Sequence, residues 1–258
     1  MKRFLKILSL GTAALMLAGS LAACSGKPGA GLNLISDGKL VMGTNAYFPP
    51  FEYKEGNEVV GVDVDIVKAI AKKLDLTFEV KGDIEFESLP ESLKTRDIDL
   101  IAAGFTALAD REEAMDFSDS YYTALQTVIV RADSAYTTLA DIKDKGLKIG
   151  GQSGTTGLSE AEKLTDKDKA IGYTNGALAV QDLINGNLDV VIIDNNPAKE
   201  YKEQHSSDIK LLENQFEEEH YVIGIPKGNK KLLEAVNNAL KDIKEDGTLQ
   251  KILDNYIK

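Results

Sequence analysis

Two segments of this chain, residues 93–104 and 183–194, share one pattern. Each runs from a leucine through five residues to an aspartate, and then into an apolar stretch with the length of a buried strand. Segments 40–45 and 147–152 form a second, weaker pair, in which a short apolar strand leads through glycine to an amide side chain. Together the two pairs predict two lobes of similar strand–helix topology.

The rest of the body alternates strand and helix patterns, which predicts an α/β fold. Apolar residues at helical spacing predict helices over residues 64–74, 232–243 and 249–257, with Gly247 ending the second. Buried strands are expected over residues 39–43, 100–103, 128–130, 147–149, 190–193 and 221–225. Ligands of α/β sheets bind beyond the carboxyl ends of strands, so a cleft between the sheets would be lined by Asn45, Gly104, Gln152 and Asp194.

The first 23 residues are expected to be a secretory signal peptide. Lys2, Arg3 and Lys6 precede an apolar run that is too short to span a bilayer comfortably. The run ends in Leu-Ala-Ala-Cys, which resembles a lipobox and predicts Cys24 as the lipid-modified N-terminus. Cys24 is the only cysteine, so the fold has no intramolecular disulfide. Residues 24–38 are expected to form a lipid-anchored tether, with a reach on the order of 20 Å as a flexible coil.

Length and charge exclude several classes of protein. The mature chain has about 235 residues, which suits two lobes better than one small core. The signal peptide carries three positive charges and no acid, so removing it changes the net charge from −11 to −14. Such a charge argues against nucleic-acid binding. The acidic run 217–219 is interpreted as a solvated loop. No metal-ligand spacing is present, and no cofactor is expected.

The stretch from Ala103 to Tyr122 carries groups that suit a free α-amino acid. A strand ends at Gly104, Thr106 follows, and Arg111 begins a short helix that Asp110 caps. A guanidinium can hold the ligand carboxylate through two hydrogen bonds, while backbone carbonyls and a carboxylate suit the ammonium. By itself, an arginine flanked by glutamates is more often half of a weak surface ion pair.

The same stretch closely resembles the fingerprint of the extracellular solute-binding proteins of family 3, the amino-acid-binding proteins of bacterial ABC importers. The resemblance covers the chain from about Lys39 to Lys258. It implies a periplasmic-binding-protein-like fold, in which two hinge strands join two α/β lobes around a ligand cleft. Lobe 1 would comprise residues 39–123 and 221–258, and lobe 2 residues 124–220. The hinge crossings are expected near residues 122–126 and 219–222.

The resemblance also implies roles for individual residues. Arg111 matches the carboxylate clamp, while the Gly104 carbonyl, the Thr106 hydroxyl and Asp194 match positions that receive the ammonium. Phe48 and Phe86 match apolar walls of the site, whereas Phe51 is expected to pack in the core. The glycine-rich loop 152–157, at the start of a helix, suits a carboxylate. The full expected ligand-binding set is Asn45, Phe48, Phe86, Gly104, Phe105, Thr106, Arg111, Gln152, Gly154, Thr155, Thr156 and Asp194.

The resemblance implies that Asn45, Gln152 and Ile193 face the side chain of the ligand, so ligand preference is expected to depend on them. The two amides carry no charge, which favours a neutral polar amino acid over a basic or an acidic one. This preference would be overturned if Glu52 or Glu87 faced the site. The expected function is that of a lipid-anchored, monomeric receptor that delivers a polar L-amino acid to an ABC permease. A Gram-positive surface is favoured over a periplasm.

Two other classes remain open at this point. Enzymes such as cyclohexadienyl dehydratases resemble this family, and turnover of prephenate-like acids would favour that interpretation. However, His205 and His220 lie outside the recognised motifs, and the expected site contains no clear carboxylate pair for acid–base catalysis. A ligand-sensing module is the second alternative. The sequence does not include a signalling segment that would support it.

Overall fold

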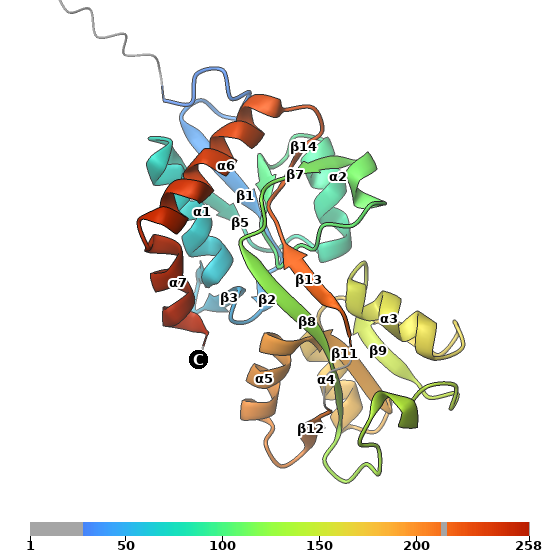
Figure 1. The fold of residues 1–258 in the computed structure, drawn as a ribbon. Helices are drawn as coiled ribbons and strands as arrows, with labels where there is room; N and C mark the ends of the chain where they lie inside the picture. The colour runs from blue at the N-terminus through green and yellow to red at the C-terminus, as the bar shows by residue number, and fades with distance from the viewer. Residues whose placement is uncertain (1–27, 213–215, 258) are drawn as a thin grey trace, which may run out of the picture.

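The computed structural model describes residues 28–212 and 216–257. The chain forms two lobes, each built around its own β-sheet, and two paired strands connect them (Figure 1). This confirms the α/β architecture with two lobes. A small third sheet belongs to lobe 1 and contains β2 (Tyr47–Phe48), β3 (Glu52–Glu55) and β4 (Glu58–Val60).

The sheet of lobe 1 has the strand order β5–β1–β6–β14–β7, with β1 parallel to both of its neighbours and β14 antiparallel to both of its own. Helices α1, α6 and α7 cover one face and α2 the other (Figure 1). The bounds are β1 Lys39–Gly43, β5 Thr77–Lys81, β6 Leu100–Ile101, β7 Met115–Phe117, β14 Gly224–Pro226, α1 Val62–Lys73, α2 Leu89–Lys94, α6 Lys230–Glu245 and α7 Thr248–Tyr256, with 3-10 turns η1 Phe86–Ser88 and η2 Arg111–Glu113.

Side chains alternate between the two faces of this sheet. Leu40 and Met42 belong to the core beneath α1, α6 and α7, whereas Val41 packs with the α2 residues Leu89 and Leu93. This is the two-residue period of a strand covered on both faces. Helix α1 has acids in its first turn and lysines in its last turn, which complements the helix dipole.

Lobe 2 has the strand order β10–β9–β11–β8–β12, and β13 also pairs with β8. Helix α3 packs on one face of this sheet, and α4 and α5 pack on the other. The bounds are β8 Tyr122–Arg131, β9 Ile149–Gln152, β10 Ala170–Tyr173, β11 Val190–Asp194, β12 Ile209–Leu211, β13 Glu218–Tyr221, α3 Thr156–Leu164, α4 Gly176–Ile184 and α5 Asn195–Gln204, with a 3-10 turn η3 Leu139–Asp141.

The repeated aspartate has the same role in each lobe. Asp99 Oδ2 accepts a hydrogen bond from the Val41 backbone N–H at 2.9 Å, and Asp189 Oδ2 accepts one from the Lys148 N–H at 2.9 Å. Each carboxylate therefore ties the start of one parallel strand, β6 or β11, to the neighbouring strand, β1 or β9. This gives the internal sequence similarity a physical cause, because both strands must be aligned where their carboxyl ends form the site.

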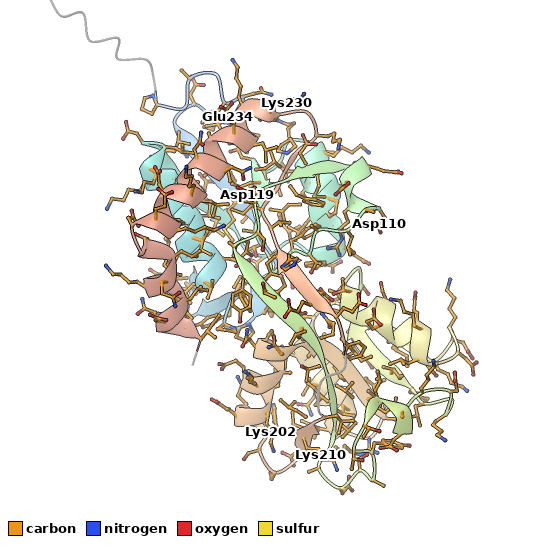
Figure 2. All side chains as sticks on the ribbon, in the orientation of Figure 1. Asp110, Asp119, Lys202, Lys210, Lys230 and Glu234 are labelled. Carbon is orange, nitrogen blue, oxygen red and sulfur yellow. The ribbon has the colours of Figure 1, made fainter. Side chains whose placement is uncertain are left out.

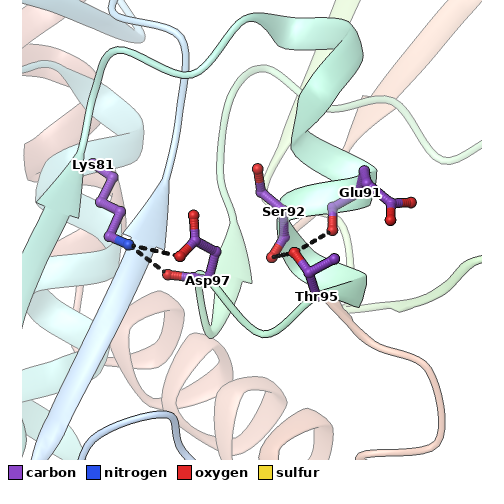
Figure 3. Close-up of polar contacts among 5 residues, drawn as sticks. All are labelled: Lys81, Glu91, Ser92, Thr95 and Asp97. Atoms are coloured by element: carbon purple, nitrogen blue, oxygen red, sulfur yellow. Dashed lines mark hydrogen bonds and ion pairs between the residues drawn. The ribbon is translucent and has the colours of Figure 1, made fainter.

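The turn between α2 and β6 is also fixed by polar contacts (Figure 3). Thr95 Oγ1 donates to the Glu91 carbonyl at 2.8 Å, so this carbonyl accepts from both the hydroxyl and the backbone N–H of Thr95 at the end of the helix. Lys81 Nζ donates to the carbonyl of Asp97 at 2.8 Å and contacts its carboxylate at 3.3 Å. These contacts anchor the segment that leads into Asp99.

Two expectations about element boundaries differ from the structure. The strand expected over residues 221–225 is divided into β13 and β14, because Tyr221 pairs with Tyr122 of β8 whereas Gly224 pairs with Ile101 in lobe 1. The chain leaves one sheet and enters the other within these residues. In addition, β9 begins at Ile149 and continues to Gln152, so the expected strand 147–149 was placed too early.

The N-terminal tether also differs from expectation. Leu32 and Leu34 pack against the core of lobe 1, and Asn229 Nδ2 donates to the Leu32 carbonyl at 2.9 Å. Residues 32–38 are therefore part of the folded domain, because their apolar side chains gain more from burial than from remaining in solvent. The signal peptide and Cys24 lie outside the described residues. Within the described ranges, no helix combines the length and apolarity needed to cross a membrane.

Candidate ligand-binding site

A cavity lies where the strand ends of the two sheets meet. Asn45, which follows β1, and Gly104, which follows β6, contribute from lobe 1. Gln152 at the end of β9 and Asp194 at the end of β11 contribute from lobe 2. The four strand ends expected to form a site therefore do line one cavity.

The structure brings most of the expected set together. The cavity lining comprises Asn45, Phe48, Glu52, Phe86, Ala103, Gly104, Thr106, Arg111, Gln152, Thr155, Thr156 and Asp194. Phe105 and Gly154 were expected there but are not part of the lining. Phe105 lies behind Arg111, and the carbonyl of Gly154 accepts a hydrogen bond from it. Ile193 packs against Gly176, and Phe51 is fully buried, as expected of a core residue.

Among the described residues that line the cavity, Arg111 is the only cation. It begins η2, where the side chain of Asp110 accepts from its backbone N–H. Figure 2 shows Asp110 at the surface of lobe 1. Its Nη1 donates to the Thr106 carbonyl at 2.9 Å, and its Nη2 donates across the lobes to the Gly154 carbonyl at 2.7 Å. The guanidinium carbon lies 4.2 Å from the ring centroid of Phe105, a cation–π contact. Burial lowers the pKa of Arg111, but a guanidinium remains charged at neutral pH.

The loop from Gln152 to Gly157 joins β9 to α3, as expected. Thr155 is the N-cap residue of α3 and accepts from the Leu158 N–H. Gly154 has φ +77°, and a side chain there would approach Glu87 of lobe 1 to 2.9 Å. A glycine is needed at this point because it allows the two lobes to come into close contact.

Asp194 is buried beside the cavity. The hydroxyl of Tyr221 donates to its Oδ1 at 2.7 Å, and its side chain makes no capping bond to α5. Helix capping therefore does not explain the residue. Burial, with a further contribution from the charge of Glu219, raises the pKa of Asp194 to about 7. The carboxylate thus lacks a full cationic partner among the residues that the structure describes.

Glu219 was interpreted from the sequence as part of a solvated loop, and this was wrong. Its Oε2 accepts from the Thr106 hydroxyl of lobe 1 at 2.7 Å and from the Thr156 hydroxyl of lobe 2 at 2.9 Å. Glu219 lies in β13, one of the two connecting strands. A run of three acidic residues does not reveal this contact. The side chain of Glu219 faces the two hydroxyls because β13 pairs with β8, and the sequence alone does not show that pairing.

The two amides meet across the cavity. Gln152 Nε2 donates to Asn45 Oδ1 at 3.0 Å and to the Thr174 carbonyl at 3.0 Å, which uses both of its N–H groups. Asn45 Nδ2 donates to the Ile84 carbonyl at 2.8 Å. Carbonyl partners fix the orientation of each amide, since an oxygen cannot donate. Gln152 can therefore offer a ligand only its oxygen.

Glu52 is the main cavity residue outside the expected binding set, although the sequence had marked it as one that could change the ligand preference. It is paired with Phe48 in the register of β2 and β3, so both side chains project to the same side of that small sheet. Its side chain is hydrogen-bonded to Asp63 of α1. Glu87, the other candidate, is exposed and is not in the cavity lining. Among the described residues, no cluster of three or more potential ligands could hold a metal ion.

Comparisons with known proteins agree with this geometry. Residues 40–258 match the family described as bacterial extracellular solute-binding proteins, family 3. The chain belongs to this family. It is 34% identical to the arginine-binding extracellular protein ArtP of Bacillus subtilis, with 83% of this chain and 84% of ArtP covered. A probable histidine-binding protein of Neisseria gonorrhoeae is also 34% identical, with coverage of 92% and 90%.

Solved structures of similar proteins have the same fold. An ancestral arginine-binding protein bound to glutamine has a TM-score of 0.80 at 37% identity, covering 86% of this chain and 99% of that protein. The same comparison with an ancestral arginine-binding protein bound to arginine gives a TM-score of 0.79 at 37% identity and the same coverage. The family resemblance and the two-lobed fold expected from the sequence are thus confirmed.

The raised pKa of Asp194 predicts a pH-dependent cost to folding. A carboxyl group that has a pKa of about 3.9 when unfolded and about 7 when folded destabilises the native state progressively as pH rises between these values. Asp194→Asn removes this cost. The free energy of unfolding can be measured with urea for the ligand-free variant and wild type. The difference between them, Asp194→Asn minus wild type, should increase by roughly 2 kcal/mol from about pH 5 to about pH 8.

Asp208→Asn is the matched control, because Asp208 is an exposed aspartate of the same lobe. Its stability relative to wild type should change little over the same range. A stability difference for Asp194→Asn that stays constant with pH would contradict the assignment of a strongly raised pKa to Asp194.

Proposed function

We propose that this protein is the extracytoplasmic binding component of an ABC importer and that it binds a free L-amino acid between its lobes. The observation that carries the proposal is the pairing of charges in one cavity. Arg111 supplies a cation for the α-carboxylate, and the under-compensated carboxylate of Asp194 supplies an anion for the α-ammonium. A zwitterion placed between them would give each buried charge the partner it lacks.

The remaining backbone and hydroxyl groups fit the same ligand. The backbone N–H of Thr156, in the first turn of α3, suits the carboxylate, whereas that of Thr155 already donates to the Gln152 carbonyl at 3.2 Å. The Gly104 carbonyl and the Thr106 hydroxyl suit the ammonium. Phe48 and Phe86 supply the apolar walls. These roles follow the family positions that the residues match.

We further propose that the ligand has a side chain that donates hydrogen bonds. Gln152 presents only an oxygen, and Glu52 adds a carboxyl group from the wall that carries Phe48. Asn45 and Gln152 led us to expect a neutral polar amino acid, provided that Glu52 faced away from the site. Glu52 lines the cavity, so this condition is not met. Arginine therefore ranks ahead of glutamine, and an acidic side chain would meet acceptors where it needs donors. The ancestral arginine-binding protein found with both arginine and glutamine supports this pair of candidates.

Binding would act by lobe closure. Contacts across the lobes, such as Arg111 to Gly154 and Gln152 to Asn45, exist only when the lobes meet, so a ligand that adds more such contacts favours the closed state. We propose β8 and β13 as the hinge, with lobe 1 as residues 39–123 and 221–258 and lobe 2 as residues 124–220. The permease would then recognise the closed surface.

No chemical step is proposed. The binding of a zwitterion accounts for Arg111, Asp194 and the Thr106 hydroxyl, and the relatives described above are named as binding proteins. We also propose that the protein acts as a monomer, because the two lobes of one chain complete the cavity.

A screen of thermal unfolding tests the binding proposal. The mature chain without its lipid-bearing Cys24, residues 25–258, is unfolded and refolded to remove bound ligand and is then heated with each of the twenty amino acids. A ligand at 100 times its Kd should stabilise the protein by about 2.7 kcal/mol. We expect stabilisation by arginine or glutamine and none by glutamate. Arg111→Ala should abolish it, and Arg111→Lys should weaken it strongly because a lysine cannot form the two-point contact.

The Glu112→Gln variant is the matched control, since Glu112 is an exposed neighbour of Arg111 on η2. It should be stabilised as the wild type is. If no amino acid stabilises the protein, or if glutamate does so best, the proposed function is wrong.

A lipid anchor on Cys24 is the second part of the proposal. It would hold the protein at the outer face of the cell membrane of a Gram-positive host. The motif at the end of the signal peptide and the absence of any other cysteine support it. Expressed in a Gram-positive host, the wild type should fractionate with membranes, whereas Cys24→Ala should be recovered as soluble protein. Membrane association of Cys24→Ala equal to that of the wild type would contradict the anchor.

A further inference from the structure

Beneath the cavity lies a pair of acids that the binding of the α-carboxylate and α-ammonium does not use. Glu52 and Asp63 are both fully buried, and their side chains are hydrogen-bonded to each other. Among the described residues, no N–H group and no hydroxyl group donates a hydrogen bond to Glu52 Oε2 or to Asp63 Oδ1. Two carboxyl groups can share such a hydrogen bond only if a proton lies between them.

The surroundings of the pair contain hydroxyl groups and acids. The Tyr121 hydroxyl donates to Asp63 Oδ2 at 2.7 Å, and the Gly104 backbone N–H donates to the same oxygen at 2.8 Å. Asp194 and Tyr221 are the other titratable groups that act electrostatically on Glu52. None of these groups is a cation. Burial and the adjacent Asp63 raise the pKa of Glu52 well above its ordinary value.

The two acids occupy different positions relative to the cavity. Asp63 is tied to backbone and hydroxyl groups of lobe 1, whereas Glu52 lines the cavity beside Phe48. Both belong to lobe 1, so their contact does not require the lobes to close. A ligand side chain that passes along Phe48 therefore meets Glu52 first.

We propose that Glu52 and Asp63 share one proton in the ligand-free protein and that a cationic ligand side chain expels it on binding beside Glu52. The proton passes to solvent, and the ligand cation takes over its role of separating two negative charges. A neutral side chain of the same shape leaves the proton in place. This inference rests on the proposed function, because it needs an amino acid in the cavity, and it adds a mechanism by which the site distinguishes charged from uncharged side chains.

Isothermal titration calorimetry counts the protons directly. L-Arginine and L-citrulline, whose side chains have nearly the same shape but differ in charge, are titrated into the mature chain in buffers of different ionisation enthalpy at about pH 7.5. Both ligands carry the same ammonium and carboxylate, so any proton released by Asp194 is common to both. We expect arginine to release about one proton more than citrulline. For each unit by which the pH is lowered, the Kd of arginine should therefore rise by about tenfold more than the Kd of citrulline does.

Two variants provide the second measurement. Glu52→Gln cannot hold the shared proton, so arginine binding to this variant should release about one proton fewer than binding to the wild type. Glu55→Gln removes an equal charge from an exposed position on the same strand, β3, and should release as many protons as the wild type.

The outcomes separate this inference from the proposed function. If neither arginine nor citrulline binds the wild type, and no other amino acid binds either, the proposed function fails, and the inference fails with it. If arginine binds and releases no more protons from the wild type than citrulline does, or than it releases from Glu52→Gln, the inference alone is overturned. Equal release by both ligands also overturns it, because the proton would then respond to the ammonium that they share.

Discussion

The guanidinium of Arg111 is the group on which the geometry of the site depends. It is carried by lobe 1, is flanked by the rings of Phe86 and Phe105, and donates to the carbonyl of Gly154 in lobe 2. An arginine is suited to this position because its planar fork can bond backbone carbonyls and still present N–H groups to a carboxylate. Glu219 extends the connection by accepting hydrogen bonds from one hydroxyl in each lobe. Closure and ligand binding thus use the same few side chains.

The acids around the cavity reveal a compromise between stability and function. Asp194, Glu52 and Asp63 are buried, and burial is the largest cause of the raised pKa in each case. One arginine cannot compensate three ionised carboxyl groups, so ionising all of them in the empty site is costly and protons are retained there at neutral pH. A ligand that brings an ammonium relieves part of this cost, and one that also brings a side-chain cation relieves more. Binding energy and ligand preference would then have the same origin.

The sequence predicted the fold and the four strand ends that line one cavity, because both depend on local patterns. The repeated aspartates, Asp99 and Asp189, and the strand-end amides Asn45 and Gln152 mark equivalent positions in the two lobes. Roles that arise only from pairing between distant segments were missed. Glu219 turns toward the hydroxyls of Thr106 and Thr156 because β13 pairs with β8, and no run of three glutamates signals that. Likewise, the contact of Glu52 with Asp63 depends on how β3 packs against α1.

The central claim is that a ligand held between Arg111 and Asp194 favours the arrangement in which the two lobes meet. Small-angle X-ray scattering of the refolded mature chain, with and without saturating L-arginine, tests this most directly. The account predicts that the radius of gyration falls when the ligand is added to the wild type and does not change for Arg111→Ala. If arginine binds by calorimetry while the radius of gyration of the wild type stays the same, ligand-driven closure is contradicted.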